Sequence, residues 1–136
     1  MPYPSDGPIQ VQVSAIQAIC GRLTSAHLED LRRSVEQASL IPKQVGWDLK
    51  AAAHAEVFGV LAEAADHPAL ARLLRAGAGF AHQLMVTAGP AAGMMTVSSR
   101  RRLLAHLAAD DAAAAAAEME RHLRVLCFMG RLAGRP

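Results

Sequence analysis

The stretch His54–Leu74, HAEVFGVLAEAADHPALARLL, decides the fold, because it reads as two amphipathic helices that meet at a corner. In the first helix, apolar or aromatic residues recur every three or four positions: Trp47, Ala51, His54, Phe58, Leu61 and Ala65. The break falls at residues 66–68, where Pro68 suits the first turn of a new helix and His67 suits its cap. We therefore predict one helix from about residue 43 to residue 65, and another that begins at Pro68.

The same reasoning extends over the rest of the chain. Thr24 and Asp111 each precede a helical pattern and can cap it with a side-chain oxygen. We expect a short helix over residues 13–23, another from Thr24 to the interruption at Pro42, a fifth that begins near Val97 or Ser98, and a sixth after Asp111. No segment alternates as a strand would. The prediction is an all-α fold, an antiparallel bundle of about six helices.

Composition limits the class of protein. The chain of 136 residues suits one domain; it is 52% hydrophobic but only 4% aromatic, as expected for alanine-rich packed helices. A net charge of +2 does not predict a nucleic-acid partner. Cys20 and Cys127 lie far apart in apolar surroundings, and no secretory signal or membrane-spanning run is present, so we expect reduced thiols and a cytoplasmic protein.

We expect three segments. Residues 1–12 hold three prolines and no helical period, and they read as a loose leader. Residues 13–131 form the helical domain, and residues 132–136 form a tail.

The polar residues on apolar stripes are the candidates for a site. His54 and His122 each lie on such a stripe, and each is either a hydrogen-bonded core imidazole or part of a pocket. Arg100 shares a face with three leucines; if buried, it needs an anionic partner, and otherwise it extends into solvent beside Arg101 and Arg102. Phosphate-binding loops, nucleophile elbows and CxxC pairs are all missing, so we do not expect an enzyme.

Three segments in order, RLTSAHLEDLRRSVEQA, HAEVFGVLAEAADHPALARLL and SRRRLLAHLAADDAAAAAAEMERHL, resemble the FCD domain. This is the C-terminal effector-binding domain of FadR-type regulators in the GntR superfamily. The resemblance covers about residues 13–131, and it implies a helical domain that binds a small molecule and forms a homodimer. In the family a winged helix-turn-helix precedes the domain, and we expect no such domain within this sequence.

The resemblance also implies where a site lies. The family commonly holds a divalent metal through an aspartate or asparagine and three histidines, and these positions fall on His54, Phe58, Arg100 and His122. Phenylalanine cannot ligate and arginine is cationic, which leaves His54 and His122 as weak candidates, and we expect neither a metal nor another cofactor. Arg100 can instead bind the carboxylate of an effector in bidentate fashion.

The expected function is therefore that of an effector-binding and dimerisation domain of a FadR-type transcription regulator. Its ligand would be a small carboxylate-type metabolite, and it would bind no DNA specifically by itself. Two alternatives stay open: a metal-dependent enzyme built on a helical bundle, and a decoy that dimerises with a full-length regulator.

Overall fold

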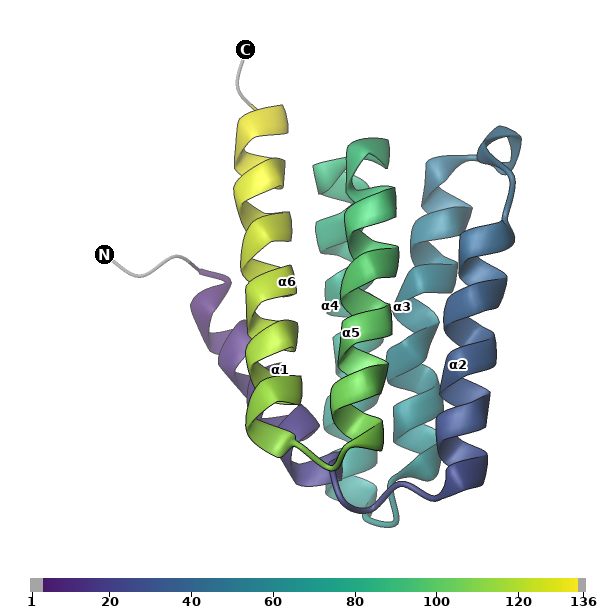
Figure 1. The fold of residues 1–136 in the computed structure, drawn as a ribbon. Helices are drawn as coiled ribbons and strands as arrows, with labels where there is room; N and C mark the ends of the chain where they lie inside the picture. The colour runs from purple at the N-terminus through teal and green to yellow at the C-terminus, as the bar shows by residue number, and fades with distance from the viewer. Residues whose placement is uncertain (1–3, 135–136) are drawn as a thin grey trace.

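The computed structural model describes residues 4–134 as a bundle of six α-helices (Figure 1). The prediction of an all-α bundle is confirmed, and the described residues include no strand. The helices are α1 (Asp6–Ile19), α2 (Ser25–Leu40), α3 (Trp47–Ala64), α4 (Pro68–Ala88), α5 (Gly93–Ala108) and α6 (Ala112–Ala133). Short 3₁₀ turns precede α3 (η1, Lys43–Val45) and α5 (η2, Pro90–Ala92).

Consecutive helices run in opposite directions, so each end of the bundle collects alternate termini. In Figure 1, the C-terminal ends of α2 and α4 lie at the same end as the N-terminal ends of α3 and α5. The helices α3 and α4 pack along each other, α2 covers α3, and α6 lies against α1, α4 and α5. Among the described helices, none combines the length and the apolar character needed to cross a membrane.

The predicted caps are confirmed at three helices. Thr24 Oγ1 accepts a hydrogen bond from the backbone N–H of His27 at the start of α2, at 3.1 Å. His67 Nδ1 accepts one from Leu70 N–H, and Asp111 Oδ1 accepts one from Ala114 N–H. Each cap satisfies a backbone donor that has no partner within its own helix.

The prediction of a loose leader over residues 1–12 is wrong where it can be checked, because α1 begins at Asp6. Pro8 lies in the first turn, where its missing N–H costs no helical hydrogen bond. Ile9, Gln12, Ile16 and Ile19 then bury one face of the helix. At the other terminus α6 continues through Ala133, two residues into the predicted tail. Residues 1–3 and 135–136 lie outside the described part.

Two other boundaries differ from the predictions. The helix expected from residue 43 begins only at Trp47, because Gly46 separates it from η1. Gly46 has a φ of 106°, a backbone conformation that favours glycine and interrupts the helix. The fifth helix begins at Gly93, about one turn before the predicted start at Val97 or Ser98. Its N-cap residue, Ala92, offers no side-chain hydrogen bond, so the sequence carried no capping signal there.

The core is built from leucine, isoleucine and many alanines, which let the helices approach closely. Gly77 of α4 marks the tightest place, since a Cβ atom built on it would lie 2.7 Å from Phe58 Cδ1 and would also meet the side chain of Gln12. This close approach fixes Phe58, and with it the middle of α3, against α4.

Candidate functional site

The structure brings the four predicted site residues together in the interior of the bundle. His54 and Phe58 come from α3, Arg100 comes from α5 and His122 comes from α6. Their exposed fractions are 3%, 0%, 1% and 0%, respectively. We call these four residues the buried cluster.

Arg100 is the centre of the buried cluster. Its Nη1 donates to His122 Nδ1 at 3.2 Å, and its Nε makes a long contact of 3.5 Å with the backbone oxygen of His54. The guanidinium carbon lies 5.6 Å from the centre of the Phe58 ring, within range of a cation–π interaction. The alternative in which Arg100 extends into solvent is wrong.

One nitrogen of this guanidinium has no partner. Arg100 Nη2 is fully buried and makes no hydrogen bond to another protein atom, and the same holds for His54 Nε2. Buried polar atoms are normally paired, because leaving one unpaired costs about 1–3 kcal/mol. The buried cluster therefore has an unused hydrogen-bond donor on Arg100 and an unused ring nitrogen on His54.

The buried cluster holds one fixed positive charge. Burial lowers the pKa of Arg100 from 12.5 to about 10, a shift that the charge of Glu118 opposes, so the guanidinium stays protonated at neutral pH. Burial and the charges of Arg100 and Lys50 lower the pKa of His54 to about 4. Burial, followed by the charge of Arg100, lowers the pKa of His122 well below its ordinary value. Both imidazoles are therefore neutral at pH 7.

The hydrogen bonds of His122 define its tautomer. A guanidinium can only donate, so His122 Nδ1 accepts the bond from Arg100 and carries no proton. The ring proton of this neutral imidazole then lies on Nε2, which donates to Thr96 Oγ1 at 3.0 Å. Thr96 thereby fixes the orientation in which His122 receives Arg100.

Glu118 is a residue that the sequence reasoning missed. Its carboxylate accepts hydrogen bonds from Ser99 at 2.7 Å, Arg102 at 2.8 Å and Arg121 at 2.6 Å. Burial by itself raises the pKa of Glu118, but these three donors outweigh it and lower that pKa to about 2. The spacing of Glu118 and His122, one turn apart on α6, was the available signal; Ser99 and Glu118 now tie α5 to α6 directly beside the buried cluster.

Arg101 and Arg102, which follow Arg100 directly in the sequence, are exposed and form ion pairs within the chain. Arg101 pairs with Glu36 of α2 at 2.9 Å, and Arg102 pairs with Glu118. The three consecutive arginines thus face three different surroundings.

The donor set of the buried cluster does not fit a divalent metal. Both ring nitrogens of His122 are already hydrogen-bonded, which leaves His54 as the one imidazole of the buried cluster with a nitrogen free to bind a metal. Arg100 adds a positive charge at the place where a cation would have to bind. Within residues 4–134, no three histidine, cysteine, aspartate or glutamate side chains gather in a way that could hold a metal.

Comparison with known proteins adds no relative: neither a protein-family model nor a curated protein nor a solved structure matches this chain.

Proposed function

We propose that this chain is the effector-binding domain of a FadR-type transcription regulator, and that Arg100 binds the carboxylate of a small metabolite. One observation carries the proposal: the guanidinium of Arg100 is 1% exposed, and its Nη2 has no hydrogen-bond partner. A buried guanidinium is stabilised chiefly by an anion.

The charges around Arg100 favour a ligand as the source of that anion. Glu118 is the acidic group whose charge acts on Arg100, but its carboxylate is already shared among Ser99, Arg102 and Arg121. A carboxylate matches a planar guanidinium, and the Nη2 donor of Arg100, which has no partner within the protein, can donate to one of its oxygens. Phe58 offers an apolar surface next to this guanidinium.

The test compares carboxylates with their uncharged amides. Benzoate and succinate should raise the melting temperature of the protein and shift the ¹⁵N resonances of the His122 ring, whereas benzamide and succinamide should do neither. Arg100→Met should abolish the response. Arg100→Lys, which keeps the charge but lacks the planar fork, should weaken binding about tenfold, equivalent to about 1.4 kcal/mol.

Arg101→Met is the matched control, because Arg101 is the neighbouring arginine but lies exposed against Glu36. It should bind benzoate as the parent protein does. Failure of every carboxylate to bind, or equal binding by the Arg100→Met variant, would contradict the proposal.

The same proposal includes a homodimer that binds no DNA specifically by itself. Phe128 and Leu132 lie one turn apart on α6 and are 54% and 50% exposed, which supports association through this helix. Arg101 and Arg102 are engaged in ion pairs within the chain, so the segment 100–102 presents no basic row to a DNA groove. Sedimentation at micromolar concentration should show a dimer, and a gel-shift titration at physiological salt should show no retained DNA.

A further inference from the structure

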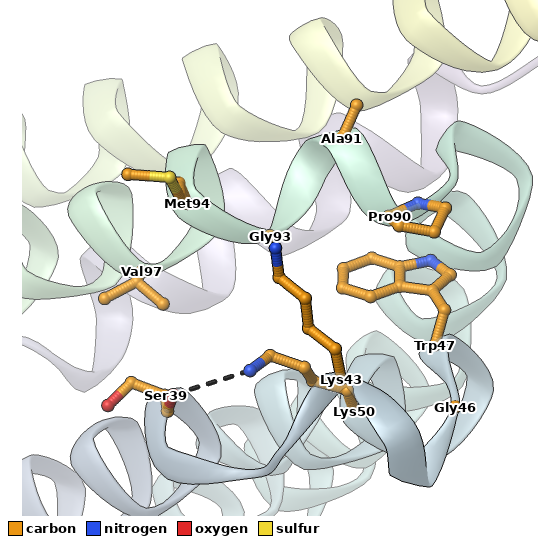
Figure 2. A pocket seen from close by; sticks show the side chains of 10 residues that line it. All are labelled: Ser39, Lys43, Gly46, Trp47, Lys50, Pro90, Ala91, Gly93, Met94 and Val97. Atoms are coloured by element: carbon orange, nitrogen blue, oxygen red, sulfur yellow. Dashed lines mark hydrogen bonds between the residues drawn. The ribbon is translucent and has the colours of Figure 1, made fainter.

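A cavity of about 620 Å³ lies at the end of the bundle where α2 finishes and α3 and α5 begin (Figure 2). Its volume is in the range of small-molecule sites. It is separate from the buried cluster, and Trp47 stands between the two: this side chain lines the cavity, while its ring lies 6.2 Å from that of His54.

The walls of the cavity combine apolar surface with positive charge. Both lysines of the chain, Lys43 and Lys50, line it, as does the chain's single tryptophan. Apolar surface comes from Pro90 and Val97 among others, and no acidic residue is among the lining residues. The twelve other basic side chains of the sequence are all arginines, and none of them lines this cavity.

The two lysines have different tasks. Lys50 Nζ donates to the backbone oxygen of Ile41 at 2.7 Å and contacts that of Ser39 at 3.4 Å, so it holds the end of α2 in place. Figure 2 shows that Lys43 instead extends toward Gly93 at the start of α5, across the cavity. Lys43 is therefore the ammonium group placed to meet a ligand, and Lys50 adds its charge from the same wall.

The indole is oriented to serve as a flat wall. Trp47 Nε1 donates to the backbone oxygen of Met85 at 2.8 Å, which fixes the ring and satisfies its polar atom. A Cβ atom at Gly93 would lie 3.4 Å from the ring, so the start of α5 also packs close to the indole. A rigid indole next to apolar side chains suits the hydrophobic body of a ligand.

We propose that this cavity is a second binding site, which takes an amphipathic anion: a ligand with an apolar or aromatic body against Trp47 and Val97 and an acidic group at Lys43. The charge complementarity comes from two lysines and from the lack of carboxylates in the lining. The site does not depend on the carboxylate proposed for Arg100.

The tryptophan makes the site directly measurable. We would titrate the protein with 8-anilinonaphthalene-1-sulfonate, an amphipathic anion, and with its uncharged analogue N-phenyl-1-naphthylamine, and follow energy transfer from Trp47. We expect saturable binding of the sulfonate at one site per chain. Lys43→Gln should weaken that binding roughly fivefold, as for the loss of one partly exposed ion pair, and should leave the uncharged analogue unchanged.

Two further variants locate the binding. Val97→Phe, which places a ring in the cavity because the side chain of Val97 points into it in Figure 2, should prevent binding of both probes. Arg75→Gln, which removes an exposed positive charge of α4 away from the cavity, should leave both unchanged. Lys43→Gln should also keep any benzoate response that depends on Arg100.

Acetylation of the two lysines by an amine-reactive ester, read by peptide mass spectrometry, provides an independent readout, and bound sulfonate should slow the reaction at Lys43. The proposal is overturned if energy transfer is absent, if Val97→Phe has no effect, or if Lys43→Gln affects both probes equally. It is also overturned if Lys43 becomes protected merely by raising the protein concentration, since a second copy of the chain would then cover the cavity.

Discussion

Acidification should destabilise this protein through the buried cluster, most measurably through His54. Its pKa is about 4 in the folded protein and 6.5 in the unfolded chain. A lowered pKa means that the unfolded chain binds the proton first, so the stability from a neutral His54 is complete above pH 6.5 and is lost as the pH falls toward 4. At pH 5 unfolded His54 is almost fully protonated, whereas folded His54 is mostly neutral.

This difference is large enough to measure. Proton linkage with these two values lowers the free energy of unfolding by about 2 kcal/mol between pH 7 and pH 5 through His54 alone. His122 acts with the same sign, because its pKa is also lowered. Arg100 and Lys50 add to this destabilisation, because their positive charges oppose the protonation of His54 in the folded protein.

Urea unfolding at pH 7, 6 and 5 tests this reasoning, with His54→Leu as the perturbation. Between pH 7 and pH 5, the free energy of unfolding of this variant should fall by about 2 kcal/mol less than that of the parent protein. At pH 7 its stability should be unchanged or higher, because a buried nitrogen without a partner has been removed. His106→Leu, the same change at a half-buried histidine outside the buried cluster, controls for the replacement of an imidazole by leucine as such. If the free energy of unfolding of His54→Leu falls with pH as steeply as that of the parent protein, the assignment of this pH dependence to His54 is refuted.

Two further substitutions test the packing beside the site. Glu118→Gln should lower the free energy of unfolding at pH 7 by roughly 3 kcal/mol, because the depressed carboxyl pKa stabilises the fold above pH 4.5 and this contribution is lost as the pH falls toward 2. Urea unfolding of Glu120→Gln, at a half-buried position on the same helix, should show a much smaller loss. Gly77→Ala should destabilise by about 1–3 kcal/mol, because its Cβ would press on Phe58. Gly79→Ala, where nothing lies within 4 Å, should instead raise the melting temperature, and equal effects at the two glycines would contradict the close approach at Gly77.

Helical periodicity in the sequence predicted most of the fold. The spacing along the third helix placed His54 and Phe58 on a buried face, and capping residues such as Thr24 and Asp111 marked where helices begin. The periodicity of single helices cannot predict that α3, α5 and α6 pack together around Arg100. The expectation that Arg100 and His122 lie close together came from the resemblance to the FCD domain, which places both in one site.

What escaped the sequence reasoning has local causes. Pro8 and Gly7 read as a loop, but the first turn of a helix tolerates both, and burial of Ile9 and Ile16 favours the helix. Glu118 could not be distinguished from a surface glutamate, since its three donors come partly from α5. The cavity at Trp47 also could not be predicted, because residues from α2, η1, α3, η2 and α5 form it together.

The two proposed sites use two different kinds of positive charge. Arg100 keeps its proton even when fully buried, and its planar fork suits a carboxylate held at a fixed angle. Lys43 is a flexible point charge at an open cavity, where a ligand of variable shape needs a mobile partner. Trp47 contacts both regions, with one side on the cavity and its ring close to His54. Because its hydrogen bond to Met85 holds the indole in place, a ligand can occupy the cavity while the packing of His54 and Arg100 stays as it is.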